Sequence, residues 1–297
     1  IKYGTACPAL INKKTCYKCI NYWRTLRVLI GDKPKGWEKS FKSVIYTIFY
    51  KFRYYLIRLN FMLMNRASIN VVASPLMQNF LSHSVNPEKI KIINITPIEK
   101  KKEYILNFKK IKGNLMKQIE LIKNLLLFIT PTYKGYHKGE NFIKKLIKKL
   151  PESYKIIIVG KKIDQNEINE RILNLDQVEL DYLYFLYHKS KITLVPSFYS
   201  EAFGRIIIES FINKTPVISS PNCGANYFFK EKKFLKVVPL KLHLWKKAIK
   251  TIIEKPPKID VKDINLIYKH FSADKSKKDF LNLIRSLIKE DIKIKQN

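Results

Sequence analysis

Two carboxylates, Glu201 and Glu209, draw attention because residues 194–225 ("LVPSFYSEAFGRIIIESFINKTPVISSPNCGA") are otherwise mostly neutral or apolar. Residues 203–213 have the apolar spacing of a helix, so Glu201 precedes the helix and Glu209 lies inside it. A helix rises about 1.5 Å per residue, so the offset between them corresponds to about 12 Å. That distance excludes a close acid/base pair. At that distance the two carboxylates could bind two parts of one extended ligand. The N–H groups of the helix start between them would be available for phosphate.

A second loop carries cations in the segment "TYKGYHKGENF", where Lys134 and Lys138 flank a glycine-containing turn that ends at Gly139. The alternatives for both loops stay open at this point: a lysine turn in so basic a chain is commonly solvated, and an acid near a helix start is common without any function.

Four apolar runs alternate with helical patterns and must position these loops. The runs are "LLLFIT", "YKIIIVG", "KITLVPS" and "TPVISS". This alternation predicts an α/β fold with a doubly wound open sheet. Ligands bind beyond the carboxyl ends of such strands, where residues 133–139, 160–162 and 197–204 form the loops.

The sequence pattern in the first third of the chain indicates a separate domain. Residues 67–97 read as a strand, a helix that begins at Ser74 and Pro75, and a second strand. Residues 99–120 read as a connection followed by a helix or an irregular segment. We therefore predict domains over residues 1–97 and 98–297. Two amphipathic docking helices, "HLWKKAIKTIIEKPP" and "DFLNLIRSLIKED", close the chain.

The net charge of +33 calls for an acidic partner, such as nucleic acid, an anionic membrane face or a phosphorylated ligand. Residues 1–70 alone hold fourteen Lys and Arg against two acids. A compositional bias toward Lys, Ile and Asn explains part of this excess. Residues 44–64 are long enough to span a membrane, but three cations at about 2.5 to 3.5 kcal/mol each argue against insertion. This segment is either a helix in the headgroup region or a helix packed on its own domain.

The four cysteines do not resemble a disulfide scaffold, and nothing else in the sequence suggests secretion, so we expect a cytoplasmic protein. Cys7, Cys16 and Cys19 include a C-x2-C pair, but a structural zinc needs a fourth ligand and no His lies nearby. Zinc binding and packed thiols both remain open for this cluster. The chain opens without Met or a signal sequence, and we expect a piece of a longer product.

The segment "PSFYSEAFGRIIIESFINKTPVISS" resembles the signature of retaining glycosyltransferases of the GT-B fold, most closely family four. "TYKGYHKGENFIKKLIKKLP" resembles the lysine-glycine loop and helix of that family, and "LYFLYHKSKITLVPS" its helix and Pro-Ser strand. "ASINVVASPLMQNFLSHSVNPEKIKIINITP" resembles the end of its first domain, and "CPALINKKTCYKCI" a cysteine-bearing segment of some members. The resemblance implies two Rossmann-like domains, of which the first is incomplete here.

The resemblance assigns roles by position. It implies that Glu201 holds hydroxyls of the donor sugar, Glu209 the ribose hydroxyls, and Lys138 the diphosphate as the sugar leaves. It implies catalytic roles for Glu201 and Lys138, and donor binding by Lys134, Gly139, Phe203, Gly204, Arg205 and Glu209. No metal or other cofactor is then required.

The sequence also departs from the family. Thr132 and Tyr133 stand where the family commonly has Gly-Arg, and Lys134 would substitute only as a point charge. The segment "ILNLDQVELD" is compact where the family has a long loop that contacts the base. Nothing before Ala67 supplies the first strand, Gly-rich loop and cleft His of a complete member. The resemblance also implies that the last helix, residues 274–290, packs back on the first domain.

The resemblance implies a nucleotide-diphosphate sugar as donor and a saccharide or lipid-linked acceptor, and no specific nucleic acid. The basic, aromatic first domain indicates an anionic membrane surface as a further partner. Two rivals stay open. One is a nucleic-acid-binding protein that uses the basic N-terminal segment, and the other is an inactive donor-binding relative.

Overall fold

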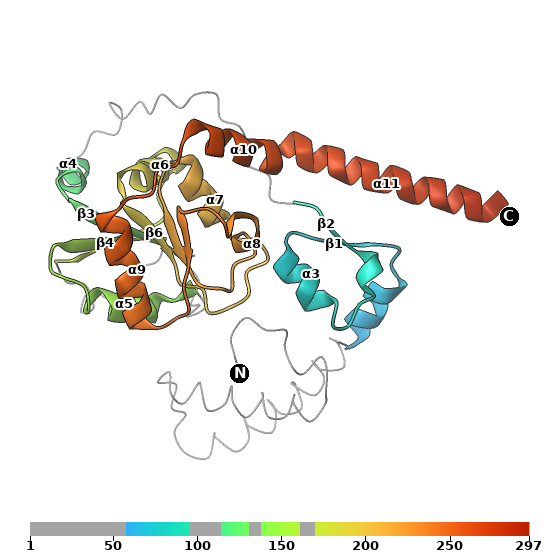
Figure 1. Cartoon of the computed structure of the whole chain (residues 1–297), viewed down its shortest axis with the longest axis horizontal. Helices are drawn as coiled ribbons and strands as arrows, with labels where there is room; N and C mark the ends of the chain where they lie inside the picture. The colour runs from blue at the N-terminus through green and yellow to red at the C-terminus, as the bar shows by residue number, and fades with distance from the viewer. Residues whose placement is uncertain (1–57, 95–113, 131–137, 161–169, 297) are drawn as a thin grey trace, which may run out of the picture. The chain divides into compact units, whose positions relative to one another are not determined.

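The computed structural model describes residues 58–94, 114–130, 138–160 and 170–296 (Figure 1). Several sequence predictions lie outside these residues: the cysteine cluster (Cys7, Cys16 and Cys19), Lys134, and the first part of the 44–64 segment. The chain divides into two compact units between Ile92 and Ile93, and each is described by itself.

The smaller unit is a parallel strand, helix, strand element, as its sequence predicts. Residues 58–66 form a helix, followed by β1 (Asn70–Val72), α3 (Pro75–Leu81), the 3-10 turn η2 (Pro87–Lys89) and β2 (Ile90–Ile92). The side chain of Ser74 accepts a hydrogen bond from the Met77 N–H, and Pro75 occupies the first turn, so α3 begins where the Ser-Pro pair predicts. A small core of Val72, Leu81, Val85 and Ile90 holds the strands to the helices.

The described residues of the larger unit form one sheet of six parallel strands in the order β5-β4-β3-β6-β7-β8. The strands are β3 (Asn124–Ile129), β4 (Tyr154–Val159), β5 (Ile172–Leu175), β6 (Ile192–Val195), β7 (Val217–Ser219) and β8 (Leu235–Val237). The chain runs outward from β3 in one direction and then, from β6, in the other. This reversal between β3 and β6 confirms the predicted doubly wound fold.

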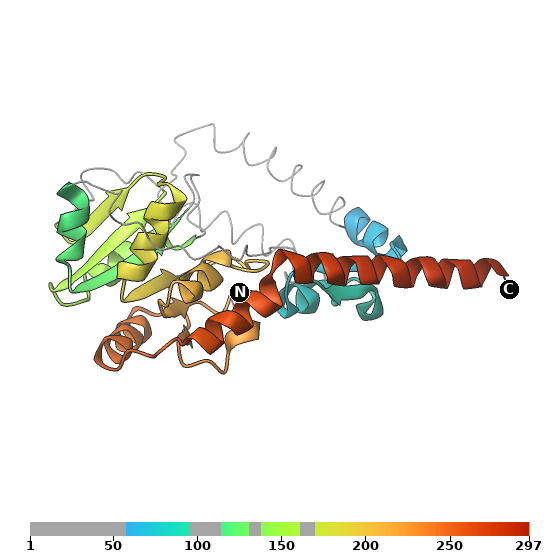
Figure 2. The same ribbon diagram turned by 90° about the horizontal axis from the view of Figure 1, so that it is seen from above.

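Helices cover both faces of this sheet because the strand residues are apolar on both sides (Figures 1 and 2). Leu126 and Phe128 of β3 pack against α5 (Glu140–Ile147) and α9 (Leu242–Glu254). Leu125 and Leu127 point to the other face, toward α4 (Asn114–Glu120) and α6 (Leu180–Lys189). The remaining helices are α7 (Arg205–Ile212), α8 (Asn226–Phe229), α10 (Val261–Phe271) and α11 (Ala273–Gln296).

The sheet is larger than the four strands that the sequence predicts. β5 forms within the segment taken as a compact loop, and β8 follows the short helix α8. The helix α7 begins at Arg205 rather than at 203.

Among the described residues, no helix combines the length and the apolar character needed to cross a bilayer. Within the same residues, no group of three or more His, Cys, Asp or Glu side chains could hold a metal ion.

Candidate functional site

The predicted loops meet at the edge of the sheet where the strands end. Gly139 precedes α5 and lies against the end of β6, so closely that a Cβ atom would stand 2.3 Å from the Pro196 carbonyl oxygen. Gly139 also has a φ of 97°, in the left-handed region that residues with a side chain rarely adopt. Only glycine therefore brings the start of α5 this close to the loop that holds Glu201.

Lys138 and Glu201 form an ion pair across these two loops, with Nζ 2.9 Å from Oε1. Oε1 of Glu201 is buried, and the ion pair with Lys138 is the one polar contact that the structure gives it within the described part of the chain. The Lys138 side chain is 29% exposed and that of Glu201 13%. The pair thus combines an accessible cation with a nearly buried carboxylate that retains accepting capacity.

Two helices at this edge, α5 and α7, begin in the same way. Gly139 precedes α5 and Gly204 precedes α7, both in the left-handed conformation and neither able to cap its helix with a side chain. The first N–H groups of a helix lack intrahelical partners and carry the positive end of the helix dipole. Each start therefore offers donors and partial positive charge to an anion.

The loop after β6 is joined to the loop after β7 by backbone hydrogen bonds. The Glu201 N–H donates to the Asn222 carbonyl oxygen at 2.7 Å, and the Gly224 N–H donates to the Glu201 carbonyl oxygen at 3.1 Å. The Ala225 N–H donates to the carbonyl oxygen of Phe203. These bonds fix the backbone on both sides of Glu201.

Aromatic side chains and a buried thiol pack against the two joined loops. The Phe203 ring packs against Phe228 and Phe271, with centroids 6.0 and 5.5 Å away. Cys223 is fully buried, and burial together with the nearby Glu201 charge raises the pKa of its thiol. The side chains of Phe203 and Cys223 are therefore part of the core beneath the site.

Glu209 is held from two directions on α7. The Tyr187 hydroxyl donates to Oε2 at 3.1 Å, and Arg205 pairs with Oε1 at 3.3 Å. Burial, followed by the Glu209 charge, raises the pKa of Tyr187 well above its usual value, so its hydroxyl stays protonated and acts as the donor. The Arg205 side chain is 58% exposed, whereas that of Glu209 is 17% exposed.

A third acid at this edge is absent from the sequence predictions. Glu140 begins α5, is only 2% exposed, and accepts a hydrogen bond of 2.6 Å from the Thr130 hydroxyl at the end of β3. Its other oxygen, Oε2, is buried and has no hydrogen-bond partner among the described residues. The position directly after Lys138 and Gly139 is the one signal in the sequence that could have pointed to it.

The structure thus brings Lys138, Gly139, Glu201 and Gly204 to one place. Glu209 and Arg205 follow on α7 with Tyr187 behind them, while Lys134 lies outside the described residues.

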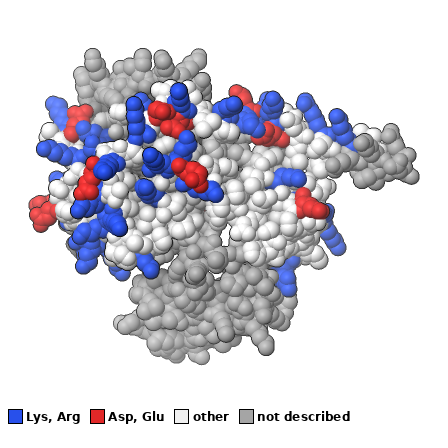
Figure 3. Space-filling model, in the orientation of Figure 1, with Lys and Arg blue, Asp and Glu red and all other residues white. Residues whose placement is uncertain are grey.

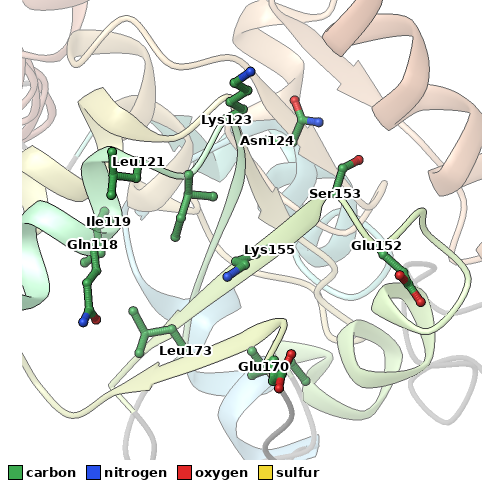
Figure 4. Close-up of a pocket in the computed structure, with 12 residues that line it drawn as sticks. Gln118, Ile119, Leu121, Lys123, Asn124, Glu152, Ser153, Lys155, Glu170 and Leu173 are labelled. Carbon is green, nitrogen blue, oxygen red and sulfur yellow. The ribbon is translucent and has the colours of Figure 1, made fainter.

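A cavity of about 720 Å³ lies at the opposite edge, at the amino ends of β3, β4 and β5 (Figure 4). Asn124, Lys155 and Glu170 are among the side chains that line it. None of the predicted site residues belongs to this cavity.

Comparison with known proteins agrees with this architecture. HepE from Anabaena, in complex with UDP, superposes with a TM-score of 0.62 at 18% identity, over 77% of this chain and 68% of that one. Sucrose-phosphate synthase from Thermosynechococcus elongatus gives 0.63 at 17% identity, over 78% and 61% of the two chains. An α,α-trehalose-phosphate synthase (UDP-forming) from Burkholderia vietnamiensis gives 0.60 at 10% identity, over 76% and 63%. These solved structures share the fold.

No curated protein matches the chain by sequence. The model of the family described as glycosyl transferases group 1 matches residues 112–265, which is more than half of the 297 residues. The chain belongs to the glycosyl transferases group 1 family, the nucleotide-sugar-dependent glycosyltransferases of the GT-B fold.

Proposed function

We propose that this chain binds a nucleotide-diphosphate sugar at the carboxyl edge of the larger sheet and takes part in transferring the sugar, with retention of configuration, to an acceptor. One observation carries the proposal. The Lys138–Glu201 ion pair joins the loops that lead into two uncapped helix starts, at Gly139 and Gly204. Cations, free N–H groups and a carboxylate are thereby assembled where a sugar diphosphate needs them.

The diphosphate would lie at the helix starts. Lys138 would neutralise it and the negative charge that develops as the sugar leaves, which preorganised cations and N–H donors stabilise. Chemistry of this kind needs no metal ion, because the protein itself supplies the positive charge.

The two glutamates would bind hydroxyls. Glu201, whose carboxylate is paired with Lys138, would accept hydrogen bonds from hydroxyls of the donor sugar. Glu209, farther along α7, would accept hydrogen bonds from the ribose. A carboxylate suits this task because it only accepts, and each sugar hydroxyl can donate.

The neighbours suggest which donors to test first. HepE is described in complex with UDP-glucose, and one trehalose-phosphate synthase as UDP-forming. Uridine nucleotides and glucose are accordingly our first candidates. For the acceptor we propose a saccharide or a lipid-linked saccharide, with the protein at the cytoplasmic, anionic face of a membrane, since the net charge of +33 favours such a surface.

Thermal unfolding with a panel of UDP-, GDP- and ADP-sugars tests the proposal. A ligand at about 100 times its Kd stabilises the folded state by about 2.7 kcal/mol, which raises the melting temperature by several degrees. We expect at least one nucleotide sugar to do so.

Glu209→Ala should abolish most of this shift, because the ribose loses its acceptor. Glu254→Ala is the matched control, since Glu254 is an exposed acid on α9 that pairs only with Lys250 in the described residues. If no nucleotide sugar stabilises the wild-type chain, the proposed function is wrong.

A further inference from the structure

Tyr187 stands out among the buried side chains because it links the sheet core to the site. It lies on α6, is fully buried, and packs with Leu125, Leu127 and Ile157 in the core on that face. Its hydroxyl emerges from this core and donates to Oε2 of Glu209 at 3.1 Å. A phenylalanine would fill the same volume, so the hydroxyl itself needs an explanation.

The backbone of Tyr187 is held as firmly as its ring. The Thr215 hydroxyl donates to the Tyr187 carbonyl oxygen at 2.5 Å. The hydroxyl of Ser210 in α7 donates a hydrogen bond to the Thr215 carbonyl oxygen at 2.9 Å. The same hydroxyl lies 2.7 Å from that of Thr193 in β6. The backbone of Tyr187 is held by the hydrogen bond from Thr215 and its ring by core packing. Its hydroxyl therefore has a defined position relative to α7.

The two partners of Glu209 differ in this respect. Arg205 is 58% exposed, so water and salt compete for its guanidinium and its pairing with Glu209 is weak. Tyr187 is buried, and a hydrogen bond to a carboxylate is stronger and more directional than an exposed ion pair. Tyr187 is therefore the partner that can define the orientation of the carboxylate.

We propose that the Tyr187 hydroxyl is a positioning group that holds Glu209 for recognition of the ribose hydroxyls of a nucleotide. A carboxylate has about four accepting positions, and Tyr187 occupies one of them. The positions that remain suit the vicinal hydroxyls of a ribose. This inference rests on the proposed function, in which Glu209 binds the ribose. It predicts that the Tyr187–Glu209 contact is what lets the site distinguish ribose from deoxyribose.

The experiment measures the Kd of UDP, 2′-deoxy-UDP and 3′-deoxy-UDP for the full 297-residue chain and its Tyr187→Phe variant. For the wild type, the Kd of at least one deoxy analogue should exceed that of UDP by about 10-fold or more, as expected for a lost hydrogen bond to a charged group. In Tyr187→Phe this ratio should fall to about 2-fold or less, while the affinity for that deoxy analogue changes by less than about 2-fold. If UDP does not bind, GDP and ADP with their deoxy forms replace it.

Tyr182→Phe is the matched control. Tyr182 lies on the same helix and is partly buried against Phe185, and its hydroxyl has no hydrogen-bond partner among the described residues. This variant removes the same atom from the same helix and should keep the wild-type ratio. The ratio is informative because a general loss of packing would weaken the binding of both nucleotides equally.

Three outcomes separate the claims. If no nucleotide binds the wild type, the proposed function fails and this inference fails with it. If nucleotides bind but Tyr187→Phe keeps the wild-type ratio, or weakens UDP and the deoxy forms by one common factor, the proposed function stands and the inference is overturned. Should Tyr187→Phe fail to fold, Tyr187→Met tests the same contact, because it removes the hydroxyl, leaves Glu209 unchanged and fills the core with an adaptable apolar side chain.

Discussion

Lys138 and Glu201 carry opposite charges from different loops, and their contact couples two parts of the proposed donor site. The lysine follows β3 and the glutamate follows β6, and these two strands are neighbours in the sheet. Binding of a diphosphate by Lys138 would therefore also depend on where Glu201 holds the lysine ammonium. The pair suits a lysine that must be held in place yet remain accessible.

Lys138→Met should lower the affinity for a nucleoside diphosphate by about 10-fold or more, because it removes a charge-assisted contact with phosphate and keeps most of the side-chain volume. Isothermal titration calorimetry with the nucleotide that binds the wild type measures this effect. Lys145→Met is the control, since Lys145 is an exposed lysine on α5. Equal losses in both variants would mean that general charge, and not Lys138, attracts the ligand.

Which residues the sequence could identify depends on where their partners lie. Glu201, Glu209 and Lys138 stand in recognisable local patterns, so a single sequence suffices to single them out. Tyr187 and Glu140 were missed because their roles depend on contacts with distant segments. A tyrosine in an apolar helix looks like a core residue, and only the position of α7 reveals what its hydroxyl meets.

At the scale of elements, α5 and α7 are positioned by two glycines with different requirements. Gly139 has a positive φ, and a Cβ there would meet a backbone oxygen at 2.3 Å. Gly204 also has a positive φ, but a Cβ there would find ordinary contacts of 3.5 Å or more. Only the backbone conformation requires glycine at 204, whereas conformation and space both require it at 139.

Gly204→Ala should therefore destabilise the larger unit by about 1 to 2 kcal/mol, the usual penalty for a left-handed side-chain residue. Gly139→Ala should cost about 3 kcal/mol or more, because the start of α5 must also move away from β6. Urea unfolding followed by circular dichroism compares the two variants under the same conditions. Equal midpoints would show that the loop before α5 relaxes freely, contrary to this expectation.

The strands that the sequence predicted are those with long apolar runs, such as the six residues of β4. β5 reads "ILNL" and β8 reads "LKV", which are too short and too polar to stand out from loops. Both become strands because a neighbour offers them a free edge: β4 for β5 and β7 for β8. Pairing of this kind is a tertiary effect, which local patterns do not carry.

At the scale of the whole molecule, the positive charge is distributed widely. Figure 3 shows Lys and Arg side chains spread over the visible face of the described residues, with fewer acids between them. The exposed lysines of α5 and α9 illustrate this, since Lys145, Lys246 and Lys247 all face solvent. Such a surface attracts any polyanion, so nucleic-acid binding alone would not reveal the function.

Salt dependence should separate the two kinds of binding. Binding of single-stranded nucleic acid, which releases several counterions, should weaken by orders of magnitude between about 50 and 200 mM salt. Nucleotide binding involves few charges and should weaken much less over this range. Fluorescence polarisation and calorimetry measure the two slopes.

Glu201→Ala distinguishes the sites in the same experiment. It should reduce the binding of a nucleotide sugar and leave nucleic-acid binding unchanged. The reverse pattern, with a steep salt slope and no effect of Glu201→Ala on any ligand, would favour the nucleic-acid-binding alternative.

The strand order of the larger unit has a consequence for how the chain is made on the ribosome. β3 is synthesised first and lies inside the sheet, and each later strand pairs with one that already exists: β4 with β3, β5 with β4, β6 with β3, β7 with β6 and β8 with β7. Among these six described strands, each has an earlier strand to pair with as soon as it is translated. The sheet can therefore grow strand by strand during synthesis, although parallel pairing is otherwise slow to form because its contacts are distant in sequence.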